Sequence, residues 1–306
     1  MHLPYLAWWY IRALFGRQKP LQSVIFILDQ CNLRCKHCSV YAIATPRIKS
    51  LEQIRQELQW CYDQGSRYVD FEGGELYLWK DGEYRIDDVL DLAHSIGFWS
   101  ATITTNAQKS FVGSHADQIF VSMDGVRDVH DAIRGEGVFE KLEKHIAEYK
   151  TSGTGKKVPV CVNMVINAIN YTNVAQAIEY VNDNPHIDNI SLNFHTPFPP
   201  TQSLFLDPDK RNQVIDLIID YKRRGYPIMN SVAGLKRMKM EAQHTLCTNR
   251  YCWVTNFIFS DGSRHRKCMG DMHGICDQCG FSMGGEMASL FHLSPETILA
   301  GLKLRG

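Results

Sequence analysis

Hydrophobic positions between residues 23 and 224 follow two alternating patterns. Short β-branched runs have the length of buried strands. The segments between them carry apolar residues every three to four positions, as amphipathic helices do. The segment from Ser50 to Gly65 also has boundary signals, because serine favours the start of a helix and glycine its end. The six expected strands begin at Ser23, Arg67, Ser100, Gln118, Val158 and Asn189.

Six strand–helix units in a row predict a parallel α/β sheet whose outer face is covered by helices. Six units are fewer than the eight of a complete barrel. After Gly225 the pattern changes. The segment TNFIFSDGSRHRK predicts a hairpin that turns at Asp261 and Gly262, and Ser294 followed by Pro295 predicts the start of a helix.

The composition suits one barrel-like domain with a small appendix. The chain has 306 residues, of which 44% are hydrophobic, with 33 basic and 33 acidic side chains. The chain therefore lacks the excess of positive charge that is typical of nucleic-acid-binding proteins, and we expect no nucleic acid as a partner. Eight of the ten cysteines fall into two groups whose spacing suits a metal better than disulfides. The first is Cys31, Cys35 and Cys38; the second is Cys247, Cys252, Cys268, Cys276 and Cys279.

The first cysteine group lies where the first strand ends, which is the edge of an α/β sheet where ligands bind. A structural zinc site needs four closed ligands, and His37 is poorly placed to be the fourth. Three thiolates on a four-iron cluster would instead leave one iron open for a substrate or cofactor. The group therefore favours an iron–sulfur cluster, with zinc as the alternative.

The spacing of Cys31, Cys35 and Cys38 (CxxxCxxC) after a first strand resembles the radical S-adenosylmethionine superfamily, and FEGGEL after the second strand resembles its GGE motif. The resemblance covers roughly residues 23 to 225 and implies a partial (β/α)6 TIM barrel. In this superfamily S-adenosylmethionine chelates the open iron, and reductive cleavage gives a 5′-deoxyadenosyl radical. The radical abstracts hydrogen from an organic substrate or adds to it. An electron donor such as flavodoxin or ferredoxin is implied as well.

The GGE motif assigns three residues to the cofactor. The resemblance implies that Gly73 and Gly74 let the backbone approach the methionine moiety without a Cβ in the way. Glu75 would accept hydrogen bonds from the methionine ammonium. The superfamily usually has proline after this motif, whereas this chain has Leu76.

Later strand ends add further candidates. The segment VHDAIRGEG resembles one that carries an arginine for the methionine carboxylate, so Arg134 is assigned to it, together with Ser122. Asn106 and Asn163 are candidates for the same pocket. Taken singly, Asn106, Ser122 and the neighbouring Thr104 also fit ordinary polar groups at strand ends.

The second cysteine group is similar to the twitch or SPASM appendix of radical enzymes, in which a glycine-turned hairpin brings four thiolates around an auxiliary [4Fe-4S] cluster. The resemblance assigns Cys252, Cys268, Cys276 and Cys279 as ligands. Five residues separate Gly262 from the second cysteine, where the family usually has four. A structural zinc ribbon is the alternative, since four thiolates with a terminal CxxC suit zinc.

Three other cysteines have separate interpretations. Cys247 either replaces Cys252 as a ligand or stays free. Cys161 shares a strand face with Asn163, so it either donates a hydrogen atom to a substrate radical or is a small buried residue. Cys61 lies in a helical segment and is expected to be structural.

The first residues, LPYLAWWYIRALFGRQK, predict an amphipathic helix. Arg12 interrupts the apolar run, which lacks the order of a signal peptide and is too short to span a bilayer. We therefore expect a cytoplasmic protein. Residues 1–18 either contact a membrane surface peripherally or cap the barrel. Leu3, Leu6, Tyr10, Ala13 and Leu14 are expected on one face, with Trp8, Trp9, Arg12, Arg17 and Lys19 available to a membrane.

The division of the chain is expected at residues 1–22 (helix), 23–225 (barrel) and 226–306 (cysteine-rich appendix). This layout is similar to the adenosylhopene synthase family, which favours a lipid or isoprenoid substrate. Modification of a peptide or protein side chain and dehydrogenation of a sugar-like small molecule are the alternatives. A non-catalytic, metal-stabilised binding protein would also explain the cysteines, though not the GGE motif with Arg134.

Overall fold

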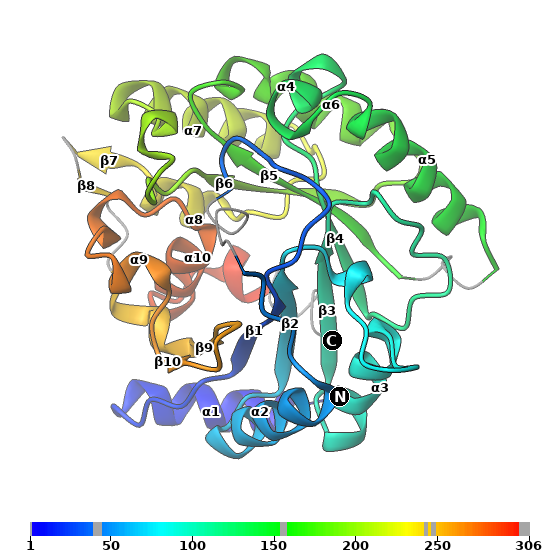
Figure 1. Cartoon of the computed structure of the whole chain (residues 1–306). Coiled ribbons are helices and arrows are strands. Elements are labelled where there is room, and N and C mark those ends of the chain that lie inside the picture. Colours follow the sequence, from blue (N-terminus) through cyan, green and yellow to red (C-terminus); the bar gives the residue numbers. More distant parts are fainter. Residues whose placement is uncertain (1, 39–44, 154–157, 242–243, 246–248, 300–306) are drawn as a thin grey trace.

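The computed structural model describes residues 2–38, 45–153, 158–241, 244–245 and 249–299. Its centre is one curved sheet with helices over the outer face (Figure 1). Strands β1 to β6 lie in sequence order and all pair in parallel. They are β1 (Gln22–Leu28), β2 (Tyr68–Gly73), β3 (Ser100–Thr105), β4 (Gln118–Ser122), β5 (Val160–Ile166) and β6 (Asn189–Phe194). The six predicted strands are thus confirmed, and the fold is an α/β partial TIM barrel.

The connecting helices follow the predicted amphipathic segments. In α2 the Ser50 side chain accepts a hydrogen bond from the backbone of Gln53, and Gly65 ends the helix at φ +121°. This helix buries Cys61, in agreement with its structural interpretation. The helices around the barrel are α2 (Leu51–Gln64), α3 (Ile86–Ile96), α4 (Asp128–Arg134), α5 (Val138–Thr151), α6 (Val174–Asp183) and α7 (Pro208–Arg223).

The C-terminal region continues the barrel sheet. The predicted hairpin is present as β9 (Thr255–Ile258) and β10 (Arg264–His265), with Gly262 at φ +82° in the turn. Strand β9 also pairs in parallel with β1, so the sheet extends to the order β10-β9-β1-β2-β3-β4-β5-β6. The other elements here are α8 (Val232–Arg237), β7 (Met240–Glu241), β8 (His244–Thr245), α9 (Met269–Met272) and α10 (Ser282–Phe291). The boundary expected at residue 225 stays a prediction, since the sheet crosses it.

Helix α1 (Leu3–Leu14) packs on the barrel, as the capping alternative expects. The indole of Trp9 is 4% exposed and donates to the Lys19 carbonyl over 2.8 Å. The Tyr10 hydroxyl donates to the Leu290 carbonyl over 3.0 Å, which joins α1 to α10. The expectation that Trp9 is available to a membrane is therefore wrong. Within the described ranges, no helix combines the length and the apolar character needed to cross a bilayer.

Candidate active site

The first cysteine group lies on the loop that follows β1. Cys35 is buried, whereas Cys31 and Cys38 are partly exposed. The three thiols are close enough that the charge of Cys38 raises the pKa of both others, in each case after the larger effect of burial. Backbone bonds fix the loop on two sides, from Lys36 N to the Ile133 carbonyl and from Glu75 N to the Gln30 carbonyl, each 2.9 Å long. The fold thus gathers the three predicted ligands at the carboxyl end of β1.

Nitrogen donors from two other elements point at these thiols. Arg134 Nη1 lies 3.7 Å from the Cys35 sulfur, and Asn106 Nδ2 lies 3.7 Å from the Cys31 sulfur. The backbone N–H of Leu33 also donates to Cys31 over 3.4 Å. Burial raises the pKa of Cys35 to about 11, so this thiol needs a strong Lewis acid to ionise. A set of thiols with N–H donors directed at sulfur fits an iron–sulfur cluster.

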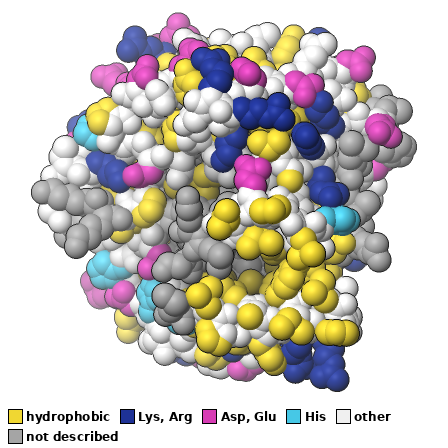
Figure 2. Space-filling model, turned by 180° about the vertical axis from the view of Figure 1, so that it is seen from behind, with side chains coloured by type: hydrophobic (Ala, Val, Ile, Leu, Met, Phe, Trp, Pro, Cys, Tyr) yellow, Lys and Arg dark blue, Asp and Glu magenta, His cyan; other side chains and the backbone are white. Residues whose placement is uncertain are grey.

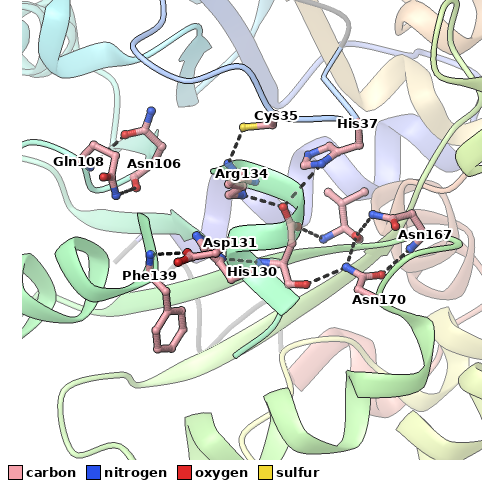
Figure 3. A network of polar contacts seen from close by, with 12 residues as sticks. Cys35, His37, Asn106, Gln108, His130, Asp131, Arg134, Phe139, Asn167 and Asn170 are labelled. Carbon is pink, nitrogen blue, oxygen red and sulfur yellow. Dashed lines mark hydrogen bonds and ion pairs between the residues drawn. The ribbon is translucent and has the colours of Figure 1, made fainter. Parts of the chain in front are cut away.

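A buried ion pair supports the arginine. Arg134 Nε donates to Asp124 Oδ2 over 2.6 Å, and the other carboxylate oxygen accepts from Val165 N over 3.0 Å. Burial alone would raise the pKa of Asp124, but the Arg134 charge holds this pKa below its usual range. Figure 3 shows Arg134 directed toward Cys35 within this network. Two nitrogens of Arg134, Nε and Nη1, already have protein partners. The assignment of this arginine to the methionine carboxylate stays a prediction.

Two histidines border the same aspartate. His37 Nδ1 lies 3.7 Å from Asp124 Oδ2, and His130 Nδ1 accepts from the Asp124 backbone N–H over 3.2 Å. Burial lowers the pKa of both histidines to about 4. They are neutral near pH 7, so Arg134 supplies the positive charge beside Cys35. Asp124 was missed as a site residue, although an acidic residue two positions after the end of β4 was a readable signal.

The glycines of the GGE motif serve the cysteine loop itself. A Cβ on Gly73, which has φ +143°, would collide with the Leu28 carbonyl oxygen, and a Cβ on Gly74 would collide with the Gln30 carbonyl. The backbone N–H of Gly74 donates to Leu28 over 2.8 Å. Both glycines therefore let β2 approach the start of the cysteine loop. Their contact with the methionine moiety stays a prediction.

Glu75 organises the end of β3. Its fully buried carboxylate accepts from the backbone of Tyr77 (3.1 Å), the Thr105 hydroxyl (2.8 Å) and the backbone of Asn106 (2.8 Å). Burial raises its pKa. Because Asn106 in turn donates toward Cys31, Glu75 positions a donor of the cysteine loop. Its predicted bond to the methionine ammonium stays a prediction.

Ser122 and Asn163 are register partners on β4 and β5, so the structure places these two candidates side by side. Asn163 Oδ1 accepts from Asn193 Nδ2, and Asn193 Oδ1 accepts from Ser282 N, each over 2.8 Å. Asn193 on β6 was missed by the sequence analysis, and it links the barrel to α10. Cys161 pairs with Asn189, the first residue of β6, and so lies away from the carboxyl ends of the strands. This position favours its interpretation as a small buried residue.

The second cysteine group surrounds one cavity. The structure brings all four predicted ligands together there; the lining is Cys252, Lys267, Cys268, Asp271, Cys276, Cys279 and Gly284. Cys247 lies outside the described residues. Among the residues that the structure does describe, no three His, Cys, Asp or Glu side chains are placed to hold a single metal ion.

The CxxC segment of this group is attached to the carboxyl end of β6. The Phe194 N–H donates to the Gly280 carbonyl (2.8 Å), and Gly280 N donates to the Thr196 hydroxyl (2.9 Å). The buried Arg211 of α7 donates to the Cys279 carbonyl over 2.8 Å and to the Met238 carbonyl over 3.0 Å. Both cysteine groups are therefore fixed at carboxyl ends of the barrel strands.

Residues 25–181 match the family model of the Radical SAM superfamily, and the chain belongs to this superfamily. It is a radical SAM enzyme, a class typified by a [4Fe-4S] cluster and S-adenosylmethionine. The non-catalytic alternative therefore loses its support.

Curated relatives include the subtilosin biosynthesis protein AlbA of Bacillus subtilis, 25% identical over 47% of this chain and 33% of AlbA. The mycofactocin maturase MftC of Mycolicibacterium smegmatis is 29% identical over 48% of this chain and 39% of MftC. The Fe-coproporphyrin III synthase of Methanosarcina barkeri is 24% identical over 70% of this chain and 55% of the synthase. The chain thus spans a third to just over half of the length of these relatives.

Solved structures share the fold. The Streptococcus suis enzyme SuiB bound to S-adenosylmethionine superposes with a TM-score of 0.64 at 18% identity, over 85% of this chain and 64% of SuiB. The enzyme anSMEcpe with bound AdoMet and Cp18Cys peptide has a TM-score of 0.58 at 16% identity, over 82% of this chain and 74% of anSMEcpe. These comparisons do not support the resemblance to the adenosylhopene synthase family or the preference for a lipid substrate.

Proposed function

We propose that this enzyme cleaves S-adenosylmethionine reductively at a cluster held by Cys31, Cys35 and Cys38, and that it modifies a side chain of a peptide or protein. The observation that carries the radical chemistry is the gathering of three thiols at the end of β1, with Arg134 and Asn106 directed at two of them. Three thiolates leave one iron open, as substrate-binding clusters require.

When bound, the cluster and S-adenosylmethionine supply a 5′-deoxyadenosyl radical after one electron arrives from a donor such as flavodoxin or ferredoxin. The chain's residues perform the positioning. Arg134 stabilises negative charge on the Cys35 sulfur, and Asp124 keeps this arginine ionised and oriented. Glu75 holds Asn106 against the Cys31 sulfur. Their placement at one edge of the barrel favours a single reaction chamber there.

The strand ends beyond the cysteine loop would receive the cofactor and the substrate. Ser122 and Asn163 are neighbours on β4 and β5, and the polar chain from Asn163 reaches α10 through Asn193. Unused hydrogen-bonding capacity on Ser122 and on the Arg134 guanidinium suits the methionine carboxylate. This arrangement would fix S-adenosylmethionine between the first cysteine group and the centre of the barrel.

The peptide assignment is supported by two relatives whose names denote a bacteriocin biosynthesis protein and a maturase. It is further supported by the similarity of fold to SuiB, which has been solved with its precursor peptide SuiA. The second cysteine group would hold an auxiliary [4Fe-4S] cluster on Cys252, Cys268, Cys276 and Cys279. A second candidate is a porphyrin substrate, because the Fe-coproporphyrin III synthase matches 70% of this chain.

A coupled mass-spectrometric assay tests this proposal. The anaerobically reconstituted enzyme is given a reductant, S-adenosylmethionine and a library of deuterated peptides; a parallel reaction contains coproporphyrin. We expect a change in peptide mass and deuterium in 5′-deoxyadenosine. Modification of coproporphyrin alone would overturn the peptide assignment, and absence of 5′-deoxyadenosine from every reaction would overturn the radical chemistry. The Cys35→Ala variant is the control for uncatalysed cleavage.

A further inference from the structure

We propose that α1 docks the enzyme on an anionic lipid surface. The contact is the outer face of α1, formed by Leu3, Trp8, Ile11, Leu14 and Phe15. These side chains are 45%, 43%, 53%, 56% and 81% exposed. They make up five of the thirteen exposed large hydrophobic side chains in the described part of the chain, although they lie within only 13 consecutive positions. Exposed apolar residues gathered in this way mark an interaction surface.

Packing on the opposite side determines which face of α1 looks outward. Trp9 and Ala13 are buried, and the ring of Trp9 lies 5.9 Å from that of Trp253. The Tyr5 hydroxyl donates to the Gly65 carbonyl over 3.0 Å, so both ends of the helix are attached. The outer face is therefore held in one orientation before any membrane is met. A surface ordered in advance loses little conformational entropy on binding.

The outer face continues onto neighbouring elements. The Tyr10 bond to the Leu290 carbonyl places the end of α10 beside α1, and Leu293, three residues further, is 63% exposed. From behind, hydrophobic side chains gather over the lower part of the surface, where α1 lies, and basic side chains stand at its edge (Figure 2). The patch is broad enough to rest on a lipid surface rather than to fill a groove.

The charges beside this face select an anionic bilayer. Residues 1–28 include no Asp or Glu, whereas Arg12, Arg17 and Lys19 are basic. The Arg12 guanidinium lies 4.6 Å from the centre of the Trp8 ring, so an arginine and a tryptophan one helical turn apart contact each other. Basic residues beside an apolar helix face are attracted to anionic headgroups, and tryptophan favours the interface. A second copy docked on the same face would bring two basic clusters together, which disfavours it.

Vesicle flotation tests the proposal with the full chain and intact clusters. We expect the enzyme to float with phosphatidylcholine vesicles that contain phosphatidylglycerol, and much less with pure phosphatidylcholine. The double variant Ile11→Glu/Phe15→Glu should lower the partition coefficient on the order of tenfold or more, because it places two carboxylates in the contact. The matched control is Val112→Glu, which replaces a side chain 48% exposed in the β3–β4 connection and should leave flotation unchanged.

A second variant, in which two basic residues are neutralised, separates the electrostatic from the apolar contribution to vesicle binding. Arg17→Gln/Lys19→Gln should weaken flotation and reduce its dependence on salt, because exposed charges are screened by ions. Uncoupled cleavage of S-adenosylmethionine and the iron content should stay at wild-type values in all these variants, which shows that the fold is intact. No flotation of the wild type, or equal flotation of the Ile11→Glu/Phe15→Glu variant, would overturn the proposal. Conversion of a dimer to a monomer by that variant, without vesicle binding of the wild type, would assign the face to a second copy instead.

Discussion

The two cysteine groups lie at the same edge of the barrel but have different surroundings. The first group is next to a buried ion pair, with Arg134 between Asp124 and the Cys35 sulfur. The ion pair beside the second group joins Lys267 to Asp271, whose side chains are 59% and 29% exposed. Solvent screens such a pair, so it adds little stability. A buried charge is directed at a sulfur of the first group, whereas the buried Arg211 beside the second group donates to backbone carbonyls, that of Cys279 among them.

The two groups also differ in their number of thiols. Three thiols meet at the first group, so a four-iron cluster there would keep one coordination position for a reactant, while four line the cavity of the second, which would be enough to close a cluster. The first group is also linked by Asn106 and Glu75 to a neighbouring strand end. The second is attached mainly through backbone carbonyls, among them that of Cys279. We therefore propose that radical generation belongs to the first group, and that the second serves electron transfer, substrate positioning or local stability.

The largest expected effect comes from Asp124→Ala. This variant leaves the Arg134 charge buried without its carboxylate, a loss that typically costs about 3–5 kcal/mol of stability. We expect a lower midpoint in chemical denaturation and loss of iron from the first group. Asp124→Asn, which keeps the shape, is the control and should lose less. Wild-type unfolding of Asp124→Ala would contradict the role given to this ion pair.

Arg211→Met applies the same test to the second group. The variant keeps much of the side-chain volume but removes the bonds to the Cys279 and Met238 carbonyls. Hydrogen bonds from a charged donor contribute about 1.5–3 kcal/mol each. The CxxC segment should loosen, so iron should be lost from the second group while 5′-deoxyadenosine still forms. Loss of radical formation would show that the two groups are not independent.

Glu75→Gln should act on the first group without unfolding it. The glutamine can no longer accept all of the bonds from Thr105, Tyr77 and Asn106. The affinity for S-adenosylmethionine should fall on the order of tenfold to a hundredfold, as loss of a charge-assisted hydrogen bond predicts. Isothermal titration of the loaded enzyme measures this change, and iron content is the control. An unchanged isotherm would remove Glu75 from the cofactor site.

The smallest expected effect is a difference in pH dependence. Burial raises the pKa of Glu286 to about 7. The side chain of Glu286 accepts hydrogen bonds from the backbone N–H and the hydroxyl of Ser231. A carboxyl whose pKa rises on folding stabilises the protein at low pH, and this stability is lost as pH rises from its ordinary value near 4.5 to about 7. The lowered pKa of Asp124 has the opposite sign, since its contribution is lost as pH falls below 3.8. In the Glu286→Gln variant, the melting temperature should change less with pH between pH 5 and 7 than in the wild type. The same slope in both proteins would refute the raised pKa of Glu286.

The barrel could be predicted because local signals agree with its packing. Each predicted strand is short and β-branched. The Ser50 side chain and the positive φ of Gly65 mark the two ends of α2. The pairing of β9 with β1 could not be predicted, because it joins segments more than 200 residues apart and no local pattern specifies the partner. Trp9 was placed on the outward face of α1 wrongly for a related reason, whereas Trp8 is exposed as expected. An apolar helix offers more than one face, and only the contacts of Trp9 and Tyr10 decide which is buried.

Site residues could be predicted from the sequence where the expected chemistry requires one particular residue type. The cysteines were found from spacing, and the glycines from a motif. Asp124 and Asn193 were missed because neither belongs to a cofactor-binding motif. They act through the residues that they contact, Arg134 and Asn163. Gly73 and Gly74 were found for another reason than the one the structure gives, which is the approach of β2 to the cysteine loop. Residue identity can be predicted locally, whereas the partner of a side chain depends on the whole fold.

Iron content and 5′-deoxyadenosine yield, measured together, test the central claim that radical generation belongs to the first cysteine group. The reconstituted enzyme should contain about eight irons per chain, four for each group. The Cys276→Ala/Cys279→Ala variant should contain about half of this iron and still cleave S-adenosylmethionine, whereas Cys35→Ala should form no 5′-deoxyadenosine. A wild-type yield of 5′-deoxyadenosine from Cys35→Ala would contradict the claim.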